Sequence, residues 1–482
     1  MAFQSSAFLS LPNPSLFAFP PGNNPTFVTP PPPGAIAFSP PFEIPDHIYQ
    51  AVLPAKVPIT IAAVYAVTAK LLNKYNKSTG KRPWAISKTR AFKAFVIAHN
   101  VFLAVYSAWT FIGMFGALRR SFVNPLGPQG VAGLVDSVCQ LNGPSGLGNA
   151  VFWNEDAKAW TSYSPDATLD SNGLPSKFDT GRLWNEGLAF YGWIFYLSKF
   201  YEVLDTLIIL AKGKFSSTLQ TYHHAGAMMC MWAGMRYMSA PIWMFAFINS
   251  GIHAMMYTYY TVTAFNIRVP MFIKRSLTTM QITQFLVGGS FAMAHSFVSY
   301  YIPAIVQVTE DVAKATVHAA VNGSAVPTAA LAGARAYLFG AATHLAGANG
   351  EPTEVVSAID KSKTAYGLQA VPCVSSNAQT FAIWLNVFYL APLTYLFVSF
   401  FIDSYLRRSN AADKKAAAKK DTAARRLSNN VAMAEKAGWE AAKNVEREVY
   451  GQGDEQAIED DVVSSKGSVR GKANGRTLRN RQ

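Results

Sequence analysis

The sequence predicts an all-α polytopic membrane protein in which seven transmembrane helices form a bundle, and three observations support this class. Half of the 482 residues are apolar, only 15% are charged, and the mean hydropathy is +0.13. Soluble proteins carry about 25% charged residues. The apolar residues gather in runs, several of them long enough to cross a bilayer, which takes about 20 helical residues. Basic residues gather in every second linker between these runs.

The seven expected spans cover residues 58–72, 91–118, 187–210, 219–238, 241–265, 278–306 and 380–405. The first is the shortest, yet Pro58 suits a first helical turn, and Lys70 can extend its charged end to the membrane surface.

The spans divide the chain into three regions. A seven-helix domain covers residues 51–408 and contains two long loops, 119–185 and 307–377. Residues 1–50 are rich in proline and phenylalanine and lack the pattern of a secretory signal, so we expect them to be disordered. Residues 409–482 read as a basic, polar tail without a continuous apolar face. This tail supplies much of the net charge of +14, so no nucleic-acid partner is needed to explain that charge.

Basic residues assign the two ends of the bundle to the two sides of the membrane. The linkers after spans one, three and five share one side and contain these residues: Lys74, Lys77, Lys81, Arg82, Lys88 and Arg90; Lys212 and Lys214; Arg268, Lys274 and Arg275. The basic tail falls on the same side because the number of spans is odd. The positive-inside rule makes this side cytosolic and the N-terminus lumenal or external. Arg119 and Arg120 are a local exception.

The three cysteines fit this topology. Cys139 and Cys373 lie in the two long loops on the non-cytosolic side, whereas Cys230 lies within span four. No cytosolic segment contains a cysteine. An oxidising compartment favours a Cys139–Cys373 disulfide over two unrelated thiols.

Polar side chains within the spans follow helical spacing. They are Lys199, Glu202, Asp205 and Thr206 on span three; His223 and His224 on span four; Asn249, His253, Met256, Tyr257 and Tyr260 on span five; and Thr278, Gln281 and Gln284 on span six. A charged side chain at the bilayer centre costs about 3 kcal/mol by insertion scales, so several in consecutive spans indicate function. For the amides, threonine and tyrosines, interhelical hydrogen bonding is the simpler alternative.

All these groups are expected near the cytosolic ends of their helices. Spans three and five run toward the cytosol and carry their polar residues near their C-terminal ends. Spans four and six start at the cytosolic side and carry their polar residues near their N-terminal ends. Purely structural contacts would scatter over both leaflets, so the convergence predicts one site that opens to the cytosol. Basic residues would rim its mouth, although each also serves as a topology signal: Lys212, Lys214, Lys274 and Arg275.

Four segments in order, 199–206 (KFYEVLDT), 222–224 (YHH), 253–260 (HAMMYTYY) and 278–284 (TTMQITQ), resemble the motifs of the ELO family of very-long-chain fatty acid elongases. The resemblance covers roughly residues 91–408 and excludes both tails. One position departs from the usual His-x-x-His-His box: Gln220 stands where its first histidine would be, as in some members that resemble polyunsaturated-chain elongases. A role for that first histidine is therefore not carried over.

The resemblance implies the condensing step of elongation in the endoplasmic reticulum membrane, in which acyl-CoA and malonyl-CoA give 3-ketoacyl-CoA, carbon dioxide and CoA. The bundle would then surround an acyl-chain tunnel. No bound cofactor and no metal are implied. The expected partners are the two CoA substrates, the lipid bilayer and the reductases and dehydratase of the elongation cycle, and a homodimer is compatible with the same assignment.

The residue types suit acyl transfer, because a neutral imidazole can act as nucleophile or base. Family chemistry implies that His223 forms an acyl-imidazole, while His224 orients it or shuttles protons. Glu202 or Asp205 would fix the histidine tautomers, and His253 would assist decarboxylation of malonyl-CoA.

The remaining polar residues would bind the substrates. Asn249 and Gln281 are candidate hydrogen-bond donors to the thioester oxygen or the enolate. Such donors often account for much of the lowering of an enzyme's activation barrier. Lys212, Lys214, Lys274 and Arg275 would contact the CoA phosphates. The other expected substrate contacts are Lys199, Thr206, Gln220, Met256, Tyr257, Tyr260, Thr278 and Gln284.

Three other functional classes fit the sequence less well. A membrane di-iron desaturase or hydroxylase needs many histidine ligands, but of the eight histidines His47, His318 and His344 lie outside the spans. A cysteine-dependent condensing enzyme would use Cys230, yet that residue lies about 10 Å along the helix from His223. A seven-helix receptor or transporter has little use for acid, base and amide groups gathered at the cytosolic side.

Overall fold

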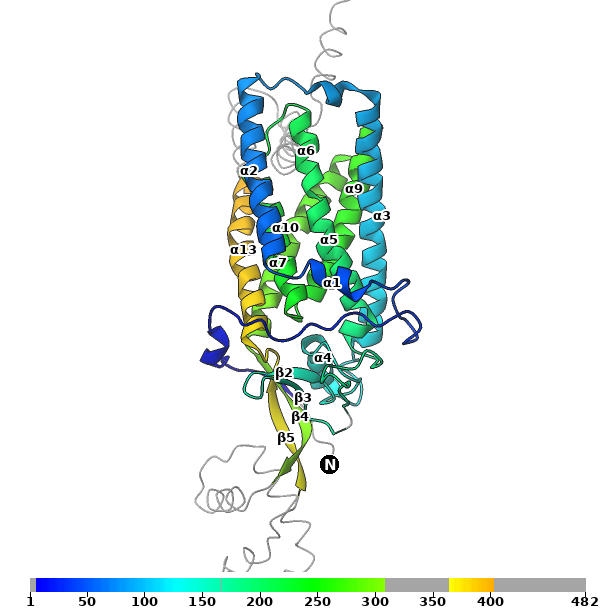
Figure 1. The fold of residues 1–482 in the computed structure, drawn as a ribbon, viewed down its shortest axis with the longest axis vertical. Helices are drawn as coiled ribbons and strands as arrows, with labels where there is room; N and C mark the ends of the chain where they lie inside the picture. Colours follow the sequence, from blue (N-terminus) through cyan, green and yellow to red (C-terminus); the bar gives the residue numbers. More distant parts are fainter. Residues whose placement is uncertain (1–5, 166, 308–363, 403–482) are drawn as a thin grey trace, which may run out of the picture.

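The computed structural model describes residues 6–165, 167–307 and 364–402, which form a helical bundle with strands and loops at one end (Figure 1). The long helices run along the long axis of the molecule. Strands β2 to β5 and helix α4 lie at the lower end of this view, and the link between α2 and α3 crosses the upper end.

Seven helical columns make up the bundle in the described part of the chain. They are α2 (Lys56–Ser78); α3 (Arg90–Ser121); η3, α5 and α6 in series (Trp184–Gly192, Trp193–Tyr201 and Val203–Ala211); α7 (Thr218–Arg236); α8, η4 and α9 in series (Ile242–Met244, Phe245–Asn249 and Ser250–Ala264); α10 (Met271–His295); and α13 (Asn377–Ile402). Each predicted span overlaps one column, and the predicted span 278–306 continues beyond the end of α10. Columns distant in sequence are neighbours, since α3 packs along α9, α2 along α7, and α13 along both α7 and α10.

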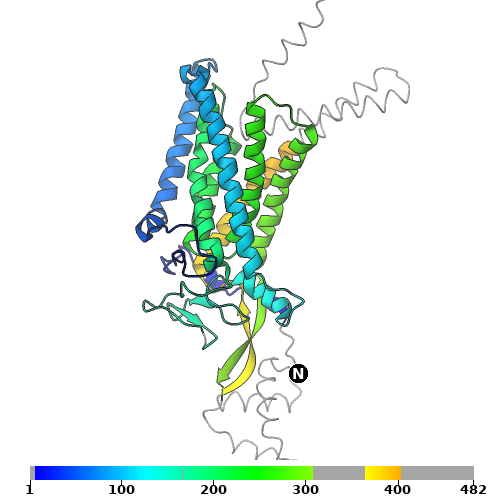
Figure 2. The ribbon, with the colours of Figure 1, turned by 90° about the vertical axis from the view of Figure 1, so that its right-hand side faces the viewer.

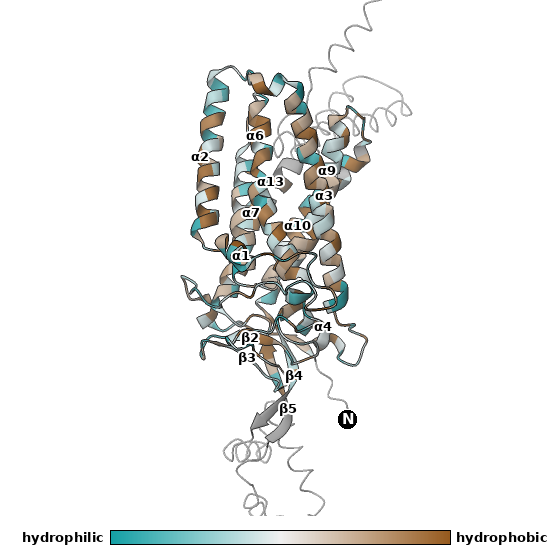
Figure 3. Ribbon diagram, turned by 45° about the vertical axis from the view of Figure 1, so that its right-hand side comes forward, coloured by the Kyte–Doolittle hydropathy of each residue, from teal (hydrophilic) through white to brown (hydrophobic). Residues whose placement is uncertain are grey.

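Hydrophobic residues, drawn in brown, recur along the helices of the bundle (Figure 3). Large apolar side chains are exposed along α2, α3 and α13, among them Ile59, Val64, Leu71, Val105, Ile112, Phe388 and Leu396. Soluble monomers rarely expose apolar surface on this scale. Two helices of the described residues are by themselves long and apolar enough to cross a membrane, α3 and the part Asn377–Val398 of α13. The other columns are interrupted by changes of helix type or diluted by buried polar residues.

The third column changes from a π-helix to an α-helix and is then interrupted at Glu202, which positions a central carboxylate. η3 is a π-helix in which Gly187 has a φ of 155°, and a Cβ added there would lie 3.0 Å from the Cβ of Ala117. α5 ends and α6 begins at Glu202. The backbone N–H of Asp205 bonds to the carbonyl oxygen of Glu202, a three-residue spacing that tightens the helix locally. Glu202 therefore lies at a joint between two helices.

A cap of strands and loops closes the lower end of the bundle. β1 (Ala7–Leu9), β4 (Val298–Gln307) and β5 (Thr364–Pro372) form an antiparallel sheet in the order β1-β4-β5, and β2 (Val151–Asn154) pairs with β3 (Ala159–Ser162). Figure 2 shows β4 and β5 as a twisted ribbon that projects beyond the helices. A disulfide joins Cys139, at the end of α4 (Gly130–Cys139), to Cys373, and this is the predicted pairing.

A buried ion pair holds the cap loops together. The side chains of Arg182 and Asp136 are 3% and 4% exposed, and Nη2 lies 2.7 Å from Oδ2. Tyr300 donates its hydroxyl to the other carboxylate oxygen at 2.7 Å. Burial, and then the adjacent Asp136, raise the pKa of Tyr300 well above its usual value, so the hydroxyl keeps its proton. The guanidinium also donates to the carbonyl oxygens of Pro144 and Gly146 at 2.8 Å. Arg182 thus ties together segments that are distant along the chain.

The described residues are mostly helical, in keeping with the predicted class, but they include five strands, and the predicted end of span six is wrong. Residues Val298–Gln307 form strand β4, although residues up to 306 were assigned to the helix. The run is apolar, and hydropathy alone does not separate a short buried strand from a helix. β4 is set by pairing with β5, which lies more than fifty residues later in the chain.

The prediction of a disordered segment 1–50 is wrong for its described part. β1 pairs with β4, η1 (Pro14–Phe17) contacts α13, and α1 (Asp46–Ala51) precedes the bundle. The indole of Trp184 donates to the carbonyl oxygen of Val28 at 2.9 Å, and the ring of Phe42 stacks edge-on against Phe190. These aromatic residues cover the lower end of the helices. The expectations for residues 308–363 and for the tail 409–482 lie outside the described residues.

Candidate active site

The predicted polar residues come together in the half of the bundle that carries the α2–α3 link. The backbone N–H of Trp84 in this link donates to the carbonyl oxygen of Ala211 at the end of α6, at 2.9 Å. Glu202 lies at the start of α6, and His223 and His224 lie in the second turn of α7. The predicted convergence of helices from different parts of the chain is therefore present.

Glu202 is the centre of the cluster, and its side chain is 3% exposed. Its Oε1 accepts from Lys199 Nζ at 2.7 Å and from Ser198 Oγ at 3.1 Å. The same oxygen lies 3.4 Å from His253 Nδ1, and Oε2 lies 4.0 Å from His224 Nδ1. Burying an isolated charge is costly, and the ammonium group of Lys199 offsets this cost for the Glu202 carboxylate, which lies beside two imidazoles. The expectation that Glu202 faces the histidines agrees with these distances.

A chain of polar contacts connects Glu202 to span six. Lys199 Nζ also donates to Asn249 Oδ1 at 3.1 Å, and Asn249 Nδ2 donates to Gln284 Oε1 at 3.3 Å. Lys199 and Asn249 were expected to bind substrate, and here they are bound to protein groups. Lys199 contacts the carboxylate of Glu202 directly, and Asn249 is connected to it through Lys199.

Asp205 differs from the expectation. Its Oδ1 lies 2.7 Å from His99 Nε2, and its Oδ2 accepts from the hydroxyl of Tyr257 at 2.6 Å. The other ring nitrogen of His99 lies 3.3 Å from the hydroxyl of Tyr201. Asp205 therefore fixes His99 rather than His223. His99 was missed, although a lone ionisable residue within an apolar span is itself a signal of function.

The two histidines of α7 have different surroundings. His223 is partly exposed, and its Nδ1 lies 2.8 Å from the hydroxyl of Tyr389 on α13. His224 is buried, and its Nε2 has no hydrogen-bond partner among the described residues. The ring of Tyr65 stacks edge-on against His224, and its hydroxyl lies 2.9 Å from Oγ1 of Thr206. His223 is thus the accessible member of the pair.

Gln220, which stands where the family's histidine box usually has its first histidine, is fully buried. Its Oε1 accepts from Ser216 Oγ at 3.5 Å, and its Nε2 has no hydrogen-bond partner among the described residues.

The other predicted site residues lie further from Glu202 in the contact network. Gln281 Nε2 contacts the sulfur of Met256 at 3.4 Å, and Thr278 donates to the carbonyl oxygen of Lys274 within its own helix. The ring of Tyr260 packs edge-on against Tyr257. For Thr278 the structural alternative fits best.

Of the four basic residues predicted to rim the site, the structure describes the side chains of three. Lys212 and Lys214 lie in the link between α6 and α7, and Lys274 Nζ lies 5.3 Å above the ring of Tyr259. Arg275 is on α10, and its side chain lies outside the described ones. Cys230 is buried, with its sulfur 3.9 Å from the carbonyl oxygen of Leu385, which fits a core residue.

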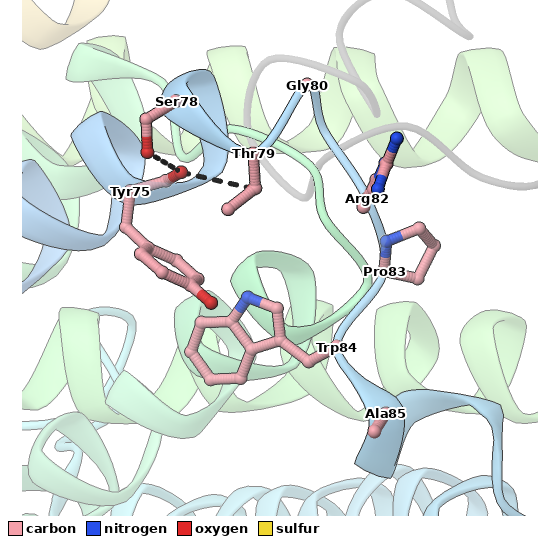
Figure 4. A pocket seen from close by; sticks show the side chains of 8 residues that line it. All are labelled: Tyr75, Ser78, Thr79, Gly80, Arg82, Pro83, Trp84 and Ala85. Atoms are coloured by element: carbon pink, nitrogen blue, oxygen red, sulfur yellow. Dashed lines mark hydrogen bonds between the residues drawn. The ribbon is translucent and has the colours of Figure 1, made fainter.

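A hollow of about 770 Å³ lies in the α2–α3 link at this end of the bundle (Figure 4). Figure 4 shows the rings of Tyr75 and Trp84 on one side of it and Arg82 with Pro83 on the other; Ser78, Thr79, Gly80 and Ala85 complete the lining. Trp84 Nε1 donates to Asn76 Oδ1 at 2.9 Å, and the amide of Asn76 donates to the carbonyl oxygen of Leu210 at 2.8 Å. The hollow is therefore fixed to the end of α6.

A smaller hollow of about 250 Å³ lies between the η4–α9 column and α10. Its lining is almost entirely apolar and includes Phe245, Ile248, Ile252 and Val287. Gln284 also lines it, so the hollow adjoins the chain of contacts that leads to Glu202.

Comparison with known proteins agrees with this arrangement. A family model described as ELO, the GNS1/SUR4 family, matches residues 52–413. Very long chain fatty acid elongase 3 of Homo sapiens is 34% identical over 105 residues, which are 22% of this chain and 39% of that protein. Fatty acid elongase 2 of Trypanosoma brucei brucei is 31% identical over 139 residues (29% and 51%), and fatty acid elongase A of Dictyostelium discoideum is 37% identical over 110 residues (23% and 40%).

The matched stretches span between about two-fifths and one half of these curated relatives. No solved structure is detectably similar to the chain. The family match, in contrast, covers most of the sequence and contains all seven helical columns together with the Glu202 cluster. On this evidence the chain belongs to the ELO (GNS1/SUR4) family.

Proposed function

We propose that the protein catalyses the condensing step of fatty acid elongation, in which acyl-CoA and malonyl-CoA give 3-ketoacyl-CoA, carbon dioxide and CoA. The observation that carries this proposal is that a partly exposed imidazole, His223, lies beside a buried polar cluster: its ring centroid is 5.5 Å from that of His224. The cluster consists of Glu202, Lys199, His224 and His253. Acyl transfer needs a nucleophile and an acid–base group at one place, and these residues supply both. The matched relatives are named fatty acid elongases.

We also propose a subcellular location and a membrane orientation for the protein. The family consists of membrane proteins, and we assign the seven columns as transmembrane helices in the endoplasmic reticulum. Basic residues at the α2–α3 link end support a cytosolic assignment of that end. The disulfide at the opposite end supports a lumenal one. The acyl chain would run from the histidines into the bundle, and the apolar hollow beside Gln284 supports this course.

The proposed reaction has two halves. In the first, Nε2 of His223 attacks the thioester carbon; the nitrogen–carbon bond forms, the carbon–sulfur bond breaks, and CoA leaves as a thiolate. In the second, malonyl-CoA loses carbon dioxide, and the resulting enolate attacks the acyl carbon and returns the bonding electrons to Nε2. His253 and Glu202 would act in this half.

A direct assay tests the proposed function. Purified protein reconstituted in lipid bilayers is incubated with acyl-CoAs of graded chain length and labelled malonyl-CoA. Labelled 3-ketoacyl-CoA is the expected product. Its absence across the series would favour the receptor or transporter class, and product without a trapped acyl-enzyme would exclude the covalent mechanism.

We further propose that the hollow in the α2–α3 link receives the nucleotide part of CoA. Aromatic rings can stack on a base, and Arg82 can pair with a phosphate. Arg82→Ala is expected to raise KM for acyl-CoA about tenfold, since a hydrogen bond to a charged group contributes about 1.5–3 kcal/mol. Because Arg82 would not touch the reacting atoms, kcat is expected to stay constant.

The control for this variant is Arg268→Ala, which removes an exposed basic residue at the same end of the bundle but outside the hollow. Both variants are assayed at two salt concentrations, because a phosphate contact weakens as salt rises. Equal KM values for Arg82→Ala and Arg268→Ala would show that the hollow does not bind CoA.

A further inference from the structure

We infer that Tyr389 on α13 is a positioning residue that holds His223 in the tautomer with hydrogen on Nδ1, so that the lone pair of Nε2 is free to attack. The inference rests on the proposed function, in which His223 is the nucleophile. Tyr389 lies outside the four sequence motifs that resemble the family, and it is brought to His223 only by the packing of α13 on α7.

Two contacts join the tyrosine hydroxyl to the same histidine. The hydroxyl donates to the backbone carbonyl oxygen of His223 at 2.9 Å, and it lies 2.8 Å from the Nδ1 atom of that residue. A phenol has one proton to donate, whereas a carbonyl oxygen has none. These counts restrict where the protons can be.

Only one arrangement satisfies both contacts. If the hydroxyl donated to Nδ1, its oxygen would face the carbonyl oxygen at 2.9 Å with no proton between them. If it donates to the carbonyl, its oxygen can accept from Nδ1, which must then carry the hydrogen. A neutral imidazole has one N–H, so Nε2 keeps its lone pair. Nε2 makes no hydrogen bond among the described residues, and the ring is partly exposed.

The packing around Tyr389 supports this role independently. Gly226, on the next turn of α7, gives the ring its space, because a Cβ added there would lie 2.1 Å from Cε2 of Tyr389. Tyr389 is 9% exposed, and its ring lies against the ring of Tyr222, with the two ring centroids 5.5 Å apart. The ring is thus held on α7 at the position from which it reaches back to His223.

His224 lacks an equivalent constraint. Its Nδ1 is 4.0 Å from Glu202, and its Nε2 has no hydrogen-bond partner among the described residues. The two adjacent histidines are therefore distinguished by Tyr389 rather than by their position in the motif.

The tautomer is consistent with a balanced acylation step. Attack by Nε2 forms the nitrogen–carbon bond and expels CoA as a thiolate, while the Nδ1 hydrogen stays in place. The acyl group is then carried on an imidazolium, whose N–H bond to the tyrosine oxygen stabilises the new charge. When the enolate takes the acyl group, the electron pair returns to Nε2, and His223 regains its starting tautomer.

The test compares Tyr389→Phe with Tyr222→Phe in the full chain in bilayers. Tyr222→Phe is a matched control, because it removes a hydroxyl from the same α7–α13 interface without touching the His223 ring. The first readout is the rate of carbethoxylation of His223 by diethylpyrocarbonate, followed by peptide mass spectrometry. The second is the single-turnover rate of acyl-enzyme formation.

Tyr389→Phe is expected to slow both rates about tenfold, the size expected for one lost hydrogen bond, with KM and melting temperature unchanged. Tyr222→Phe is expected to match the wild type. Wild-type rates in Tyr389→Phe would overturn the inference. Should Tyr389→Phe fail to fold, Gly226→Ala displaces the same ring with its hydroxyl intact and is expected to slow carbethoxylation similarly; no slowing there would also overturn it.

The two readouts separate the inference from the proposed function. Carbethoxylation reports on the free lone pair of His223 and needs neither acyl-CoA nor malonyl-CoA. If the wild type forms no 3-ketoacyl-CoA but Tyr389→Phe still slows carbethoxylation, the proposed function is wrong and the tautomer assignment stands. If the wild type forms 3-ketoacyl-CoA but Tyr389→Phe is carbethoxylated at the wild-type rate, the proposed function stands and the tautomer assignment is wrong.

Discussion

Replacing His223 by alanine is expected to lower the rate of 3-ketoacyl-CoA formation by at least about a thousandfold, because loss of a covalent nucleophile removes most of the catalysis. No other described nucleophile can take over readily. His224 is buried, and the thiol of Cys230 lies against the carbonyl of Leu385. The acyl-enzyme that the proposed mechanism predicts for the wild type, detectable by mass spectrometry, is expected to be absent from this variant.

Two further variants make the result specific. His47→Ala changes an exposed histidine on α1, outside the bundle, and is expected to retain wild-type turnover. His253→Ala is expected to form the acyl-enzyme but to pass it on slowly, since His253 acts in the second half-reaction. Full turnover by His223→Ala would overturn the mechanism, and loss of the acyl-enzyme in His253→Ala would place that histidine in the first half.

Replacing Arg182 by methionine is expected to destabilise the cap by about 3–5 kcal/mol. Breaking a buried ion pair from one side leaves the other charge buried without a partner, here the carboxylate of Asp136. The change would also remove the donors to the carbonyl oxygens of Pro144 and Gly146. A lower melting temperature and faster proteolysis within residues 130–182 would report the loss.

The surface provides a matched ion pair for comparison. Lys158 and Glu155 are 2.9 Å apart, but the lysine side chain is 63% exposed. Exposed pairs contribute about 0–1 kcal/mol, so Lys158→Ala is expected to leave the melting temperature nearly unchanged. Equal shifts for Arg182→Met and Lys158→Ala would contradict a structural role of the buried pair. Combining Arg182→Met with Asp136→Leu is expected to recover part of the stability.

The sequence predicts the features that follow from local periodicity or from the distribution of basic residues. Apolar runs locate the seven columns, basic linkers separate the two ends, and spacing along single helices brings Glu202, His224 and His253 to one level. The disulfide follows from the same topology. These inferences need only the residues within one helix or loop and the order of the spans along the chain.

The features that it does not predict depend on contacts between distant segments. His99 and Tyr389 lie on helices outside the four motifs, and their partners Asp205 and His223 lie on other columns. Strand β4 continues an apolar run and is distinguished from a helix only by its pairing with β5. The early aromatic residues are ordered because the bundle end gives them a surface, which composition cannot show.

The position of β1 has a practical consequence for handling the protein. This short strand covers the outer edge of β4, with Phe8 paired to Ser299, and the hydroxyls of Ser10 and Ser299 lie 2.6 Å apart. An uncovered strand edge presents free backbone donors and acceptors that recruit strands from other molecules. Proteolytic trimming past Ser10 is therefore expected to create a self-association surface while leaving His223, His224 and His253 in place, so that aggregation in detergent and damage to the Glu202 cluster would be separate events.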